Sequence, residues 1–261
     1  MSEESLLTVE KRGSAAIVTL NRPTKQNALS TALLQEIDAT LASLDRDPEV
    51  RGIVLTGNEK VFSTGGDLKE GLALDGIDSI RRWLEAFQFA NRRIETIGTP
   101  VIAAINGFCL TGGLELALCC DIRISGSTAQ YGITSSRIGT VAGAGATQRL
   151  ARLIGPEWTK EILFSGNFID AETALRIRLV SEVVEPERVI EAALARIEAY
   201  AQRAPLSVSY SKFAVNNGLQ MDLESALHYE RQITTTLFLS DDKREGMAAF
   251  LEKRPPVFKG N

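Results

Sequence analysis

Short apolar runs alternate with longer amphipathic segments through the first half of the chain. The runs Ala15–Leu20, Arg51–Thr56 and Pro100–Ile105 have strand length and are nearly continuous in apolar residues, which is typical of buried strands. Ser30–Leu44 and Ile77–Ile97 repeat apolar residues at helical spacing, and the serine that opens the first is a favourable N-cap. Repeated strand–helix units predict an α/β fold with parallel pairing and sites at the strand ends.

After about residue 170 the pattern becomes almost entirely helical. Prolines stand near the start of two of these segments, where the first turn of a helix tolerates them. We therefore expect residues 1–200 to form the core with the functional site, and residues 201–261 to form a separate helical region. The helical segments are Asp170–Ile177, Pro186–Ala204, Pro205–Leu219, Leu223–Leu239 and Asp241–Lys253.

A glycine-rich turn follows the apolar strand that ends at Ile105. Gly112 precedes a short helix predicted over Gly113–Cys119, and the first amides of a helix have no partner within it. These N–H groups, together with the positive end of the helix dipole, suit a developing oxyanion. Glu115 is placed to move protons on whatever those amides polarise; the alternative is that it only complements the dipole.

A second pair of glycines, Gly65 and Gly66, follows the strand predicted over Arg51–Thr56. One such pair after a strand is most often just a turn. Two of them at strand ends, one followed by a carboxylate, indicate a two-donor oxyanion hole with a base beside it. We expect the amides of Gly66 and Gly112 to converge on a single carbonyl oxygen.

These motifs resemble those of the crotonase, or enoyl-CoA hydratase/isomerase, superfamily, over nearly the whole chain. The resemblance implies an α/β fold built as a spiral of ββα units, with C-terminal helices that build trimers, often paired into hexamers. Residues 201–261 are therefore expected to be the trimerisation region of a homotrimer or homohexamer. The matching segments are Leu20–Pro23, Asn27–Leu29, Phe62–Leu68, Asn106–Ala117, Cys120–Arg123, Gly139–Thr140, Gly143–Leu150 and Gly246–Arg254.

The resemblance also implies an acyl-CoA thioester as substrate, with the amides of Gly66 and Gly112 holding its oxygen while an enolate forms. Coenzyme A is then part of the substrate, and no separate cofactor is expected. For Lys25 and Lys69 the alternative to a CoA contact is solvated surface, and for Asp67 it is a turn-stabilising role. The CoA contacts implied are Lys25, Asn27, Ala28, Leu29, Ser63, Gly65, Asp67, Leu68, Lys69, Gly143, Phe258 and Lys259.

The second catalytic position departs from the hydratase pattern. Hydratases of the family carry a second glutamate where this chain has Ser135, and a serine hydroxyl is no general base near neutral pH. Glu115 would then act alone, with Ser135 or Thr134 orienting a bound water. Hydration of a 2-enoyl-CoA is the leading prediction. Decarboxylation of a malonyl-type CoA, isomerisation of an enoyl-CoA, and a non-catalytic acyl-CoA-binding subunit stay open.

The acyl group is expected to meet walls contributed by residues 72–89. Trp83, Phe87 and Phe89 lie in the helix predicted over Ile77–Ile97. Core packing is the expected role of these three aromatic residues, and lining of the acyl pocket is the alternative. The length and branching of the acyl group are left open.

Composition narrows the class of partner. With 29 Lys and Arg against 33 Asp and Glu the net charge is -4, and no basic cluster suits nucleic acid or an anionic membrane. Three cysteines and one histidine give neither an even disulfide framework nor a Cys/His metal site, so we expect no metal and a cytoplasmic location. Residues 1–5 lack the apolar core of a signal peptide, and no apolar run reaches the length of a membrane span.

Overall fold

Six strands form the larger of two sheets in the computed structural model, which describes residues 5–261. An antiparallel hairpin stands at one edge, and the remaining strands pair in parallel. The prediction of an α/β fold with parallel strands is thus confirmed. Residues 1–5 were predicted to lack the apolar core of a signal peptide, and residues 1–4 of that segment lie outside the described residues. In sheet order the strands are β1 (Leu7–Arg12), β2 (Ala15–Leu20), β3 (Gly52–Thr56), β5 (Val101–Ile105), β7 (Ile122–Gly126) and β10 (Glu182–Val184).

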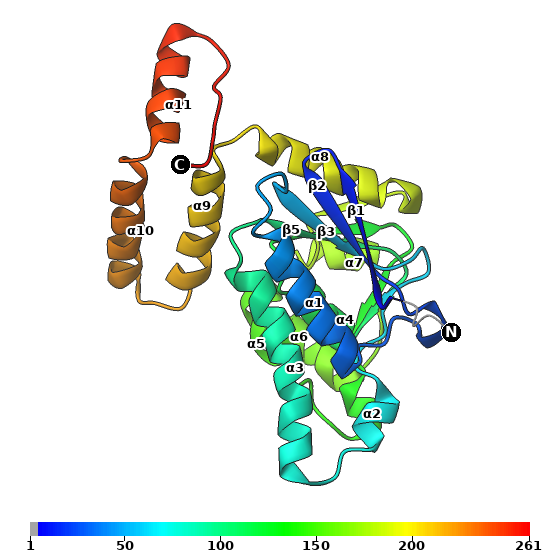
Figure 1. The fold of residues 1–261 in the computed structure, drawn as a ribbon. Helices are drawn as coiled ribbons and strands as arrows, with labels where there is room; N and C mark the ends of the chain where they lie inside the picture. The colour runs from blue at the N-terminus through cyan, green and yellow to red at the C-terminus, as the bar shows by residue number, and fades with distance from the viewer. Residues whose placement is uncertain (1–4) are drawn as a thin grey trace.

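Helices cover both faces of this sheet (Figure 1). α1 (Thr31–Leu44) and α3 (Gly76–Thr96) pack against each other over one face, and α8 (Val189–Ala201) lies on the other. Side chains along β3 alternate between these layers: Ile53 belongs to the main core, whereas Val54 belongs to the apolar cluster beneath α8. The sheet is therefore buried on both faces, as its nearly continuous apolar strands require.

A second, smaller sheet is built from strands that follow those of the first. β3 leads into β4, β5 into β6 and β7 into β8, and each pair of strands is then followed by a helix or helical turn. This is the ββα repeat that the resemblance implies. Its three leading strands are parallel and the fourth is antiparallel; in sheet order they are β4 (Val61–Ser63), β6 (Phe108–Leu110), β8 (Gln130–Gly132) and β9 (Ile169–Asp170).

The predicted helices are confirmed to within a few residues at their ends. The Ser30 hydroxyl accepts a hydrogen bond from the Leu33 amide at 3.2 Å and so caps α1 as expected. The segment predicted from Pro186 begins with a 3-10 turn before α8 starts. The other helices of the core are α2 (Leu68–Leu72), α4 (Gly112–Ala117), α5 (Ala146–Ile154), α6 (Pro156–Ser165) and α7 (Ala171–Arg176), of which α2, α5 and α6 were not predicted.

The last three helices stand away from the rest of the chain, at the upper left of Figure 1. We call residues 205–261 the C-terminal lobe; it holds α9 (Pro205–Gly218), α10 (Leu223–Leu237) and α11 (Asp241–Glu252). Lys212 of α9 ties the lobe to the core, because its Nζ lies 2.9 Å from an Asp121 carboxylate oxygen and donates to the Ile94 carbonyl at 2.7 Å. Within residues 5–261, no helix combines the length and apolar composition needed to cross a membrane.

Candidate active site

The two glycine turns meet at one end of the smaller sheet. β4 and β6 are parallel neighbours there, so the turns that follow them lie side by side. A Cβ built on Gly112 would lie 3.2 Å from the Gly66 nitrogen, and one built on Gly65 would lie 3.0 Å from the Gly112 nitrogen. The nitrogens of Gly66 and Gly112 are therefore no more than about 6 Å apart, because a Cβ lies about 2.5 Å from its own nitrogen. One oxygen can accept from both at that separation.

Both amides are free of protein acceptors within residues 5–261. Leu29 bridges the first turn by donating to the Gly65 carbonyl at 2.7 Å and accepting from the Asp67 amide at 3.0 Å, which leaves the Gly66 amide between them unused. Gly112 is the first residue of α4, so its N–H has no partner within the helix. The pair thus presents two N–H donors ready for a ligand oxygen.

Two aromatic residues of α3 leave little room for a side chain at either glycine. A Cβ on Gly66 would lie 3.0 Å from the Trp83 ring, and one on Gly112 would lie 3.0 Å from the Phe87 ring. The two rings meet edge to face with centroids 5.1 Å apart. Phe87 is buried as predicted, but the core-packing prediction is wrong for Phe89, whose side chain is 65% exposed.

Glu115 is buried, with 2% of its surface exposed, and its carboxylate reaches the loop that leads into α5. Oε1 accepts hydrogen bonds from the amides of Ala144 at 2.8 Å and Ala146 at 3.0 Å. Burial raises the pKa of Glu115 above the usual 4.5, while the two amides and the charge of Arg149 oppose this rise. Because Glu115 bonds to a distant loop, the geometry favours a positioned carboxyl over simple complementation of the dipole.

A clamp holds the loop that carries those amides. Asn91 donates to the Ala144 carbonyl at 2.9 Å, and Arg149 donates to the same oxygen at 3.1 Å. Arg149 also forms a two-pronged ion pair with Glu95, at 2.7 and 2.9 Å. The Arg149 guanidinium fills the space beside Gly145, since a Cβ on that glycine would lie 1.8 Å from Nη1. Position and protonation of Glu115 therefore depend on this clamp.

Ser135 lies in a turn that is tied to the oxyanion hole. It is buried, and it is the first residue of a 3-10 turn over Ser135–Ile138. Its neighbour Thr134 is bonded to Thr111, the residue before Gly112: the two hydroxyls are 2.9 Å apart, and the Thr134 amide donates to the Thr111 hydroxyl at 3.1 Å. The structure thus keeps the Ser135 turn next to the start of α4.

The active-site contacts of α3 recur every fourth residue. Trp83 and Phe87 pack on the two glycines, Asn91 holds Ala144, and Glu95 holds Arg149. Residues four apart lie on one face of a helix, so these four side chains form a single ridge directed at the site. The four-residue spacing is visible in the sequence. The sequence does not show which loop Asn91 and Glu95 would hold, so the roles of Asn91, Glu95 and Arg149 were not predicted.

The family relationship is decided by the extent of the match. The Enoyl-CoA hydratase/isomerase family model matches residues 10–261. The chain belongs to the enoyl-CoA hydratase/isomerase family. Its structure is correspondingly similar to that of the enoyl-CoA hydratase from Bacillus anthracis, with a TM-score of 0.94 at 37% identity, covering 98% of this chain and 100% of that one. This likeness confirms the crotonase-like fold.

Two curated relatives of this family member carry specific names. The short-chain-enoyl-CoA hydratase of Clostridium acetobutylicum is 40% identical over 247 residues, which is 94% of each chain. The crotonyl-CoA hydratase of Syntrophomonas wolfei subsp. wolfei is 38% identical over 259 residues, which is 99% of each chain.

Several residues predicted to touch CoA in this enoyl-CoA hydratase/isomerase family member have side chains that build the first glycine turn. Asn27 is fully buried and its side chain donates to the carbonyls of Val61 and Phe62 at 3.2 and 3.1 Å. The Ser63 hydroxyl donates to the Asn27 carbonyl at 2.8 Å and accepts from the Gly65 amide at 3.2 Å. Leu29 is also buried. These side chains position the Gly66 amide.

Asp67 has the turn-stabilising role that was the alternative. Its carboxylate caps α2 by accepting from the Lys69 amide at 3.0 Å, and it pairs with Arg22 at 3.1 Å. Arg22 in turn donates to the Ala28 carbonyl, so it fastens the two loops together. The remaining candidates beside the site are exposed: Lys25, Leu68, Lys69 and Gly143.

Phe258 and Lys259 are not brought together with the other candidates within one chain. The Phe258 ring packs beside Gly246 of α11, and the Lys259 amide donates to Asp242 at 2.6 Å. Figure 1 shows this end of the chain in the C-terminal lobe, at the opposite end of the molecule from α2. In residues 5–261 no three His, Cys, Asp or Glu side chains gather as metal ligands would.

Proposed function

We propose that this protein catalyses the addition of water to a 2-enoyl-CoA thioester. The observation that carries the proposal is the convergence of two unpaired amides, those of Gly66 and Gly112, with the buried Glu115 in the first turn of the helix that Gly112 begins. Two donors aimed at one oxygen stabilise an enolate, and a carboxyl of raised pKa moves the proton. The names of the curated relatives support the same reaction.

The reaction proceeds in two balanced steps at this site. Glu115 takes a proton from a bound water, whose oxygen bonds to C3 of the substrate. The electron pair of the C2–C3 double bond shifts toward the thioester oxygen, where the amides of Gly66 and Gly112 hold the negative charge. Glu115 then returns the proton to C2 as the carbonyl re-forms. One water has been added across the double bond, and the carboxylate is regenerated.

A single carboxyl is sufficient for this cycle because the proton that it accepts is the one that it delivers. Its Oε1 is held by two amides, so we assign the proton transfer to Oε2. We assign Ser135 the orientation of the attacking water, since it is buried in the turn that is tied to the start of α4. A hydroxyl orients water without taking its proton, so hydration is expected to be slower than with two carboxyls.

We further propose that the functional unit is a homotrimer or homohexamer. The exposed residues Lys25, Leu68 and Lys69 lie at the glycine turns, where they would contact CoA. If Phe258 and Lys259 contact the same CoA, they must come from a neighbouring copy, because the lobe that carries them points away in its own chain. A cytoplasmic location is part of this proposal and is supported by three cysteines that are all unbridged.

The proposal is tested by incubating the purified protein with crotonyl-CoA, a 3-enoyl-CoA and methylmalonyl-CoA, with products identified by mass spectrometry. We expect the mass of one water to be added to crotonyl-CoA. Loss of carbon dioxide from methylmalonyl-CoA, or a double-bond shift in the 3-enoyl-CoA without hydration of crotonyl-CoA, would replace the proposal by the decarboxylase or isomerase. Binding of all three without turnover would identify a non-catalytic acyl-CoA-binding subunit.

A further inference from the structure

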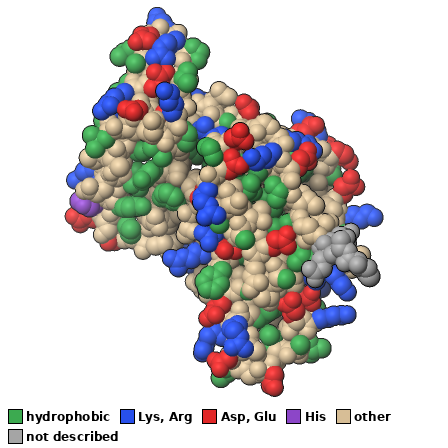
Figure 2. Space-filling model, viewed as in Figure 1, with side chains coloured by type: hydrophobic (Ala, Val, Ile, Leu, Met, Phe, Trp, Pro, Cys, Tyr) green, Lys and Arg blue, Asp and Glu red, His purple; other side chains and the backbone are tan. Residues whose placement is uncertain are grey.

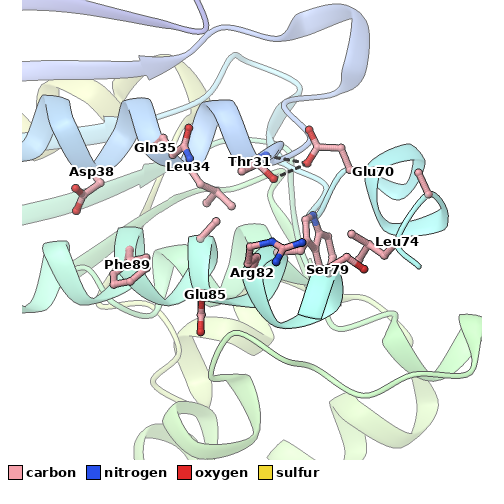
Figure 3. Close-up of a pocket in the computed structure, with 13 residues that line it drawn as sticks. Thr31, Leu34, Gln35, Asp38, Glu70, Leu74, Ser79, Arg82, Glu85 and Phe89 are labelled. Atoms are coloured by element: carbon pink, nitrogen blue, oxygen red, sulfur yellow. Dashed lines mark hydrogen bonds between the residues drawn. The ribbon is translucent and has the colours of Figure 1, made fainter. Parts of the chain in front are cut away.

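A cavity of about 710 Å³ lies between α1, α2 and α3. Figure 3 shows α1 and α3 facing each other across it, with Leu34 and Gln35 on one side and Arg82 and Phe89 on the other. Its volume is within the range of small-ligand sites. The residues that line it are Thr31, Leu34, Gln35, Asp38, Glu70, Ala73, Leu74, Ser79, Arg82, Trp83, Glu85, Ala86 and Phe89.

The lining suits an uncharged chain better than a nucleotide. Two of its three carboxylates are occupied: Glu70 accepts from the Thr31 amide and hydroxyl at 2.8 and 2.9 Å, and Asp38 pairs with Arg93 at 2.8 Å. Arg82 is the one cation in the lining, too little for the phosphates of CoA. The apolar members are Leu34, Ala73, Leu74, Trp83, Ala86 and Phe89.

Trp83 stands between this cavity and the oxyanion hole. It lines the cavity, and its six-membered ring also lies 3.0 and 3.1 Å from where a Cβ on Gly66 would be. Phe87, one turn further along α3, contacts the positions of both glycines but does not line the cavity. Of this aromatic pair, Trp83 alone therefore has the cavity on one side and an oxyanion-hole glycine on the other.

The Trp83 ring is held by packing only. Its Nε1 is buried without a hydrogen-bond partner among the described residues. Replacement of the indole by a smaller apolar side chain therefore breaks no hydrogen bond. It extends the cavity toward Gly66, which the ring now covers, and it removes an unsatisfied polar atom.

We propose that Trp83 sets the length of acyl chain that this protein accepts, by closing the active site off from the cavity between α1, α2 and α3. This inference rests on the proposed function, in which the acyl group extends from a thioester held by the Gly66 amide. With the ring in place the site takes short acyl groups. With the ring removed, the distal carbons of a longer chain enter the cavity and bury apolar surface there.

The test compares kcat/KM for crotonyl-CoA and 2-decenoyl-CoA in the wild type, in Trp83→Ala and in the milder Trp83→Leu. We expect the ratio of decenoyl to crotonyl activity to rise at least about tenfold in Trp83→Ala, because one to a few methylenes already discriminate by that factor. Trp83→Leu is expected to give a smaller rise in the same direction. An unchanged ratio in both folded variants overturns the proposal.

Two further variants separate the partition from other effects. Phe89→Ala removes an aromatic side chain that lines the same cavity but contacts neither glycine, and it should leave the ratio at its wild-type value. Ala73→Phe in the Trp83→Ala background refills the cavity from the residue that follows α2 and should abolish the gain. A gain that survives refilling places the longer chain elsewhere and counts against the proposal.

A binding measurement separates failure of the specificity proposal from failure of the proposed function. If the wild type hydrates no enoyl-CoA, the proposed function fails, and the specificity proposal is then judged by calorimetric binding of butyryl-CoA and decanoyl-CoA. The expected result is again a rise of at least about tenfold in the relative affinity for decanoyl-CoA on Trp83→Ala. Equal relative affinities in the wild type and both Trp83 variants would refute it.

Discussion

Glu115 experiences two opposing influences on its proton. Burial raises its pKa above 4.5, and the amides of Ala146 and Ala144 partly offset the rise. A base must be deprotonated to accept a proton, so activity is lost as the pH falls through this raised pKa. We therefore predict an acid limb of kcat/KM centred above pH 4.5 in the wild type, measured from initial rates of crotonyl-CoA hydration across pH. A limb at or below the usual glutamate value would contradict the assignment.

Glu115→Gln keeps the shape of the side chain and removes the base. We predict that kcat for crotonyl-CoA falls by about 10²–10⁴-fold, the usual contribution of a positioned general base. Binding of butyryl-CoA, measured by calorimetry, should change little because the oxyanion amides belong to the glycines. Wild-type turnover in this variant would remove Glu115 from the mechanism.

Thr111 occupies a backbone conformation that favours glycine, with φ 47° and ψ −116°. Its hydroxyl holds the Thr134 turn through two hydrogen bonds. We predict that Thr111→Val, which keeps the branched shape, lowers the free energy of unfolding by about 1–3 kcal/mol in urea denaturation. Thr134→Val is the matched control: it removes only the bond between the hydroxyls, so its effect should be smaller and the double variant should be less than additive. Additive losses would mean that the two side chains are independent.

At the scale of elements, the ridge of α3 connects the aromatic cover of the glycines to the clamp on the Glu115 loop. Arg149 contributes a positive charge that lowers the pKa of Glu115 and a hydrogen bond to the Ala144 carbonyl. We predict that Arg149→Met lowers kcat and moves the acid limb of kcat/KM to higher pH, because the favourable charge is lost. The measurement is the pH profile for crotonyl-CoA.

Arg149→Lys is the control for that prediction. Lysine keeps the charge but cannot reproduce the forked ion pair with Glu95 together with the bond to Ala144. Its kcat should fall while its acid limb stays near the wild-type position. If Met and Lys shift the limb equally, Arg149 acts through loop geometry and not through charge.

The longest helices and the uninterrupted apolar strands were predicted closely, whereas α5 and α6, of nine and ten residues, were missed. α1 and α3 span several turns, and β3 and β5 are uninterrupted apolar runs, so their ends fall within a few residues of prediction. β4 and β6 are three residues each, too short to show an alternation. The glycine turns and Glu115 were predicted without knowledge of the smaller sheet. The two turns lie close together only because β4 and β6 of that sheet pair in parallel.

The binding candidates show the limit of transfer by motif. Asn27 and Ser63 match the family pattern, yet their side chains bond to neighbouring backbone and are buried, which a sequence position alone does not reveal. Phe258 and Lys259 lie in the lobe that points away from the glycine turns. Ser135 at the position of the second glutamate stays a prediction, and the hydrogen bond that ties its turn to Thr111 is apparent only in three dimensions.

At the scale of the whole molecule, the C-terminal lobe is poorly covered by its own chain. Its exposed apolar side chains include Leu219 at 74%, Leu223 at 75%, Phe250 at 83% and Leu251 at 81%. Figure 2 shows apolar side chains gathered on this lobe, at the left of the view. Large exposed apolar areas mark sites of association, and closed symmetry lets identical copies cover one another.

We therefore predict that the wild type is a trimer or hexamer, measured by size-exclusion chromatography with light scattering. The double variant Phe250→Glu/Leu251→Glu should form a smaller species, because burying unpaired charges in an interface opposes association. If Phe258 and Lys259 of a neighbouring copy contact CoA, dissociation should also raise KM for crotonyl-CoA. Val9→Glu, at a half-exposed apolar position on β1, should leave the assembly intact. A wild-type monomer at micromolar concentration would contradict the prediction, and the lobe would then have to be stable with its apolar side chains in water.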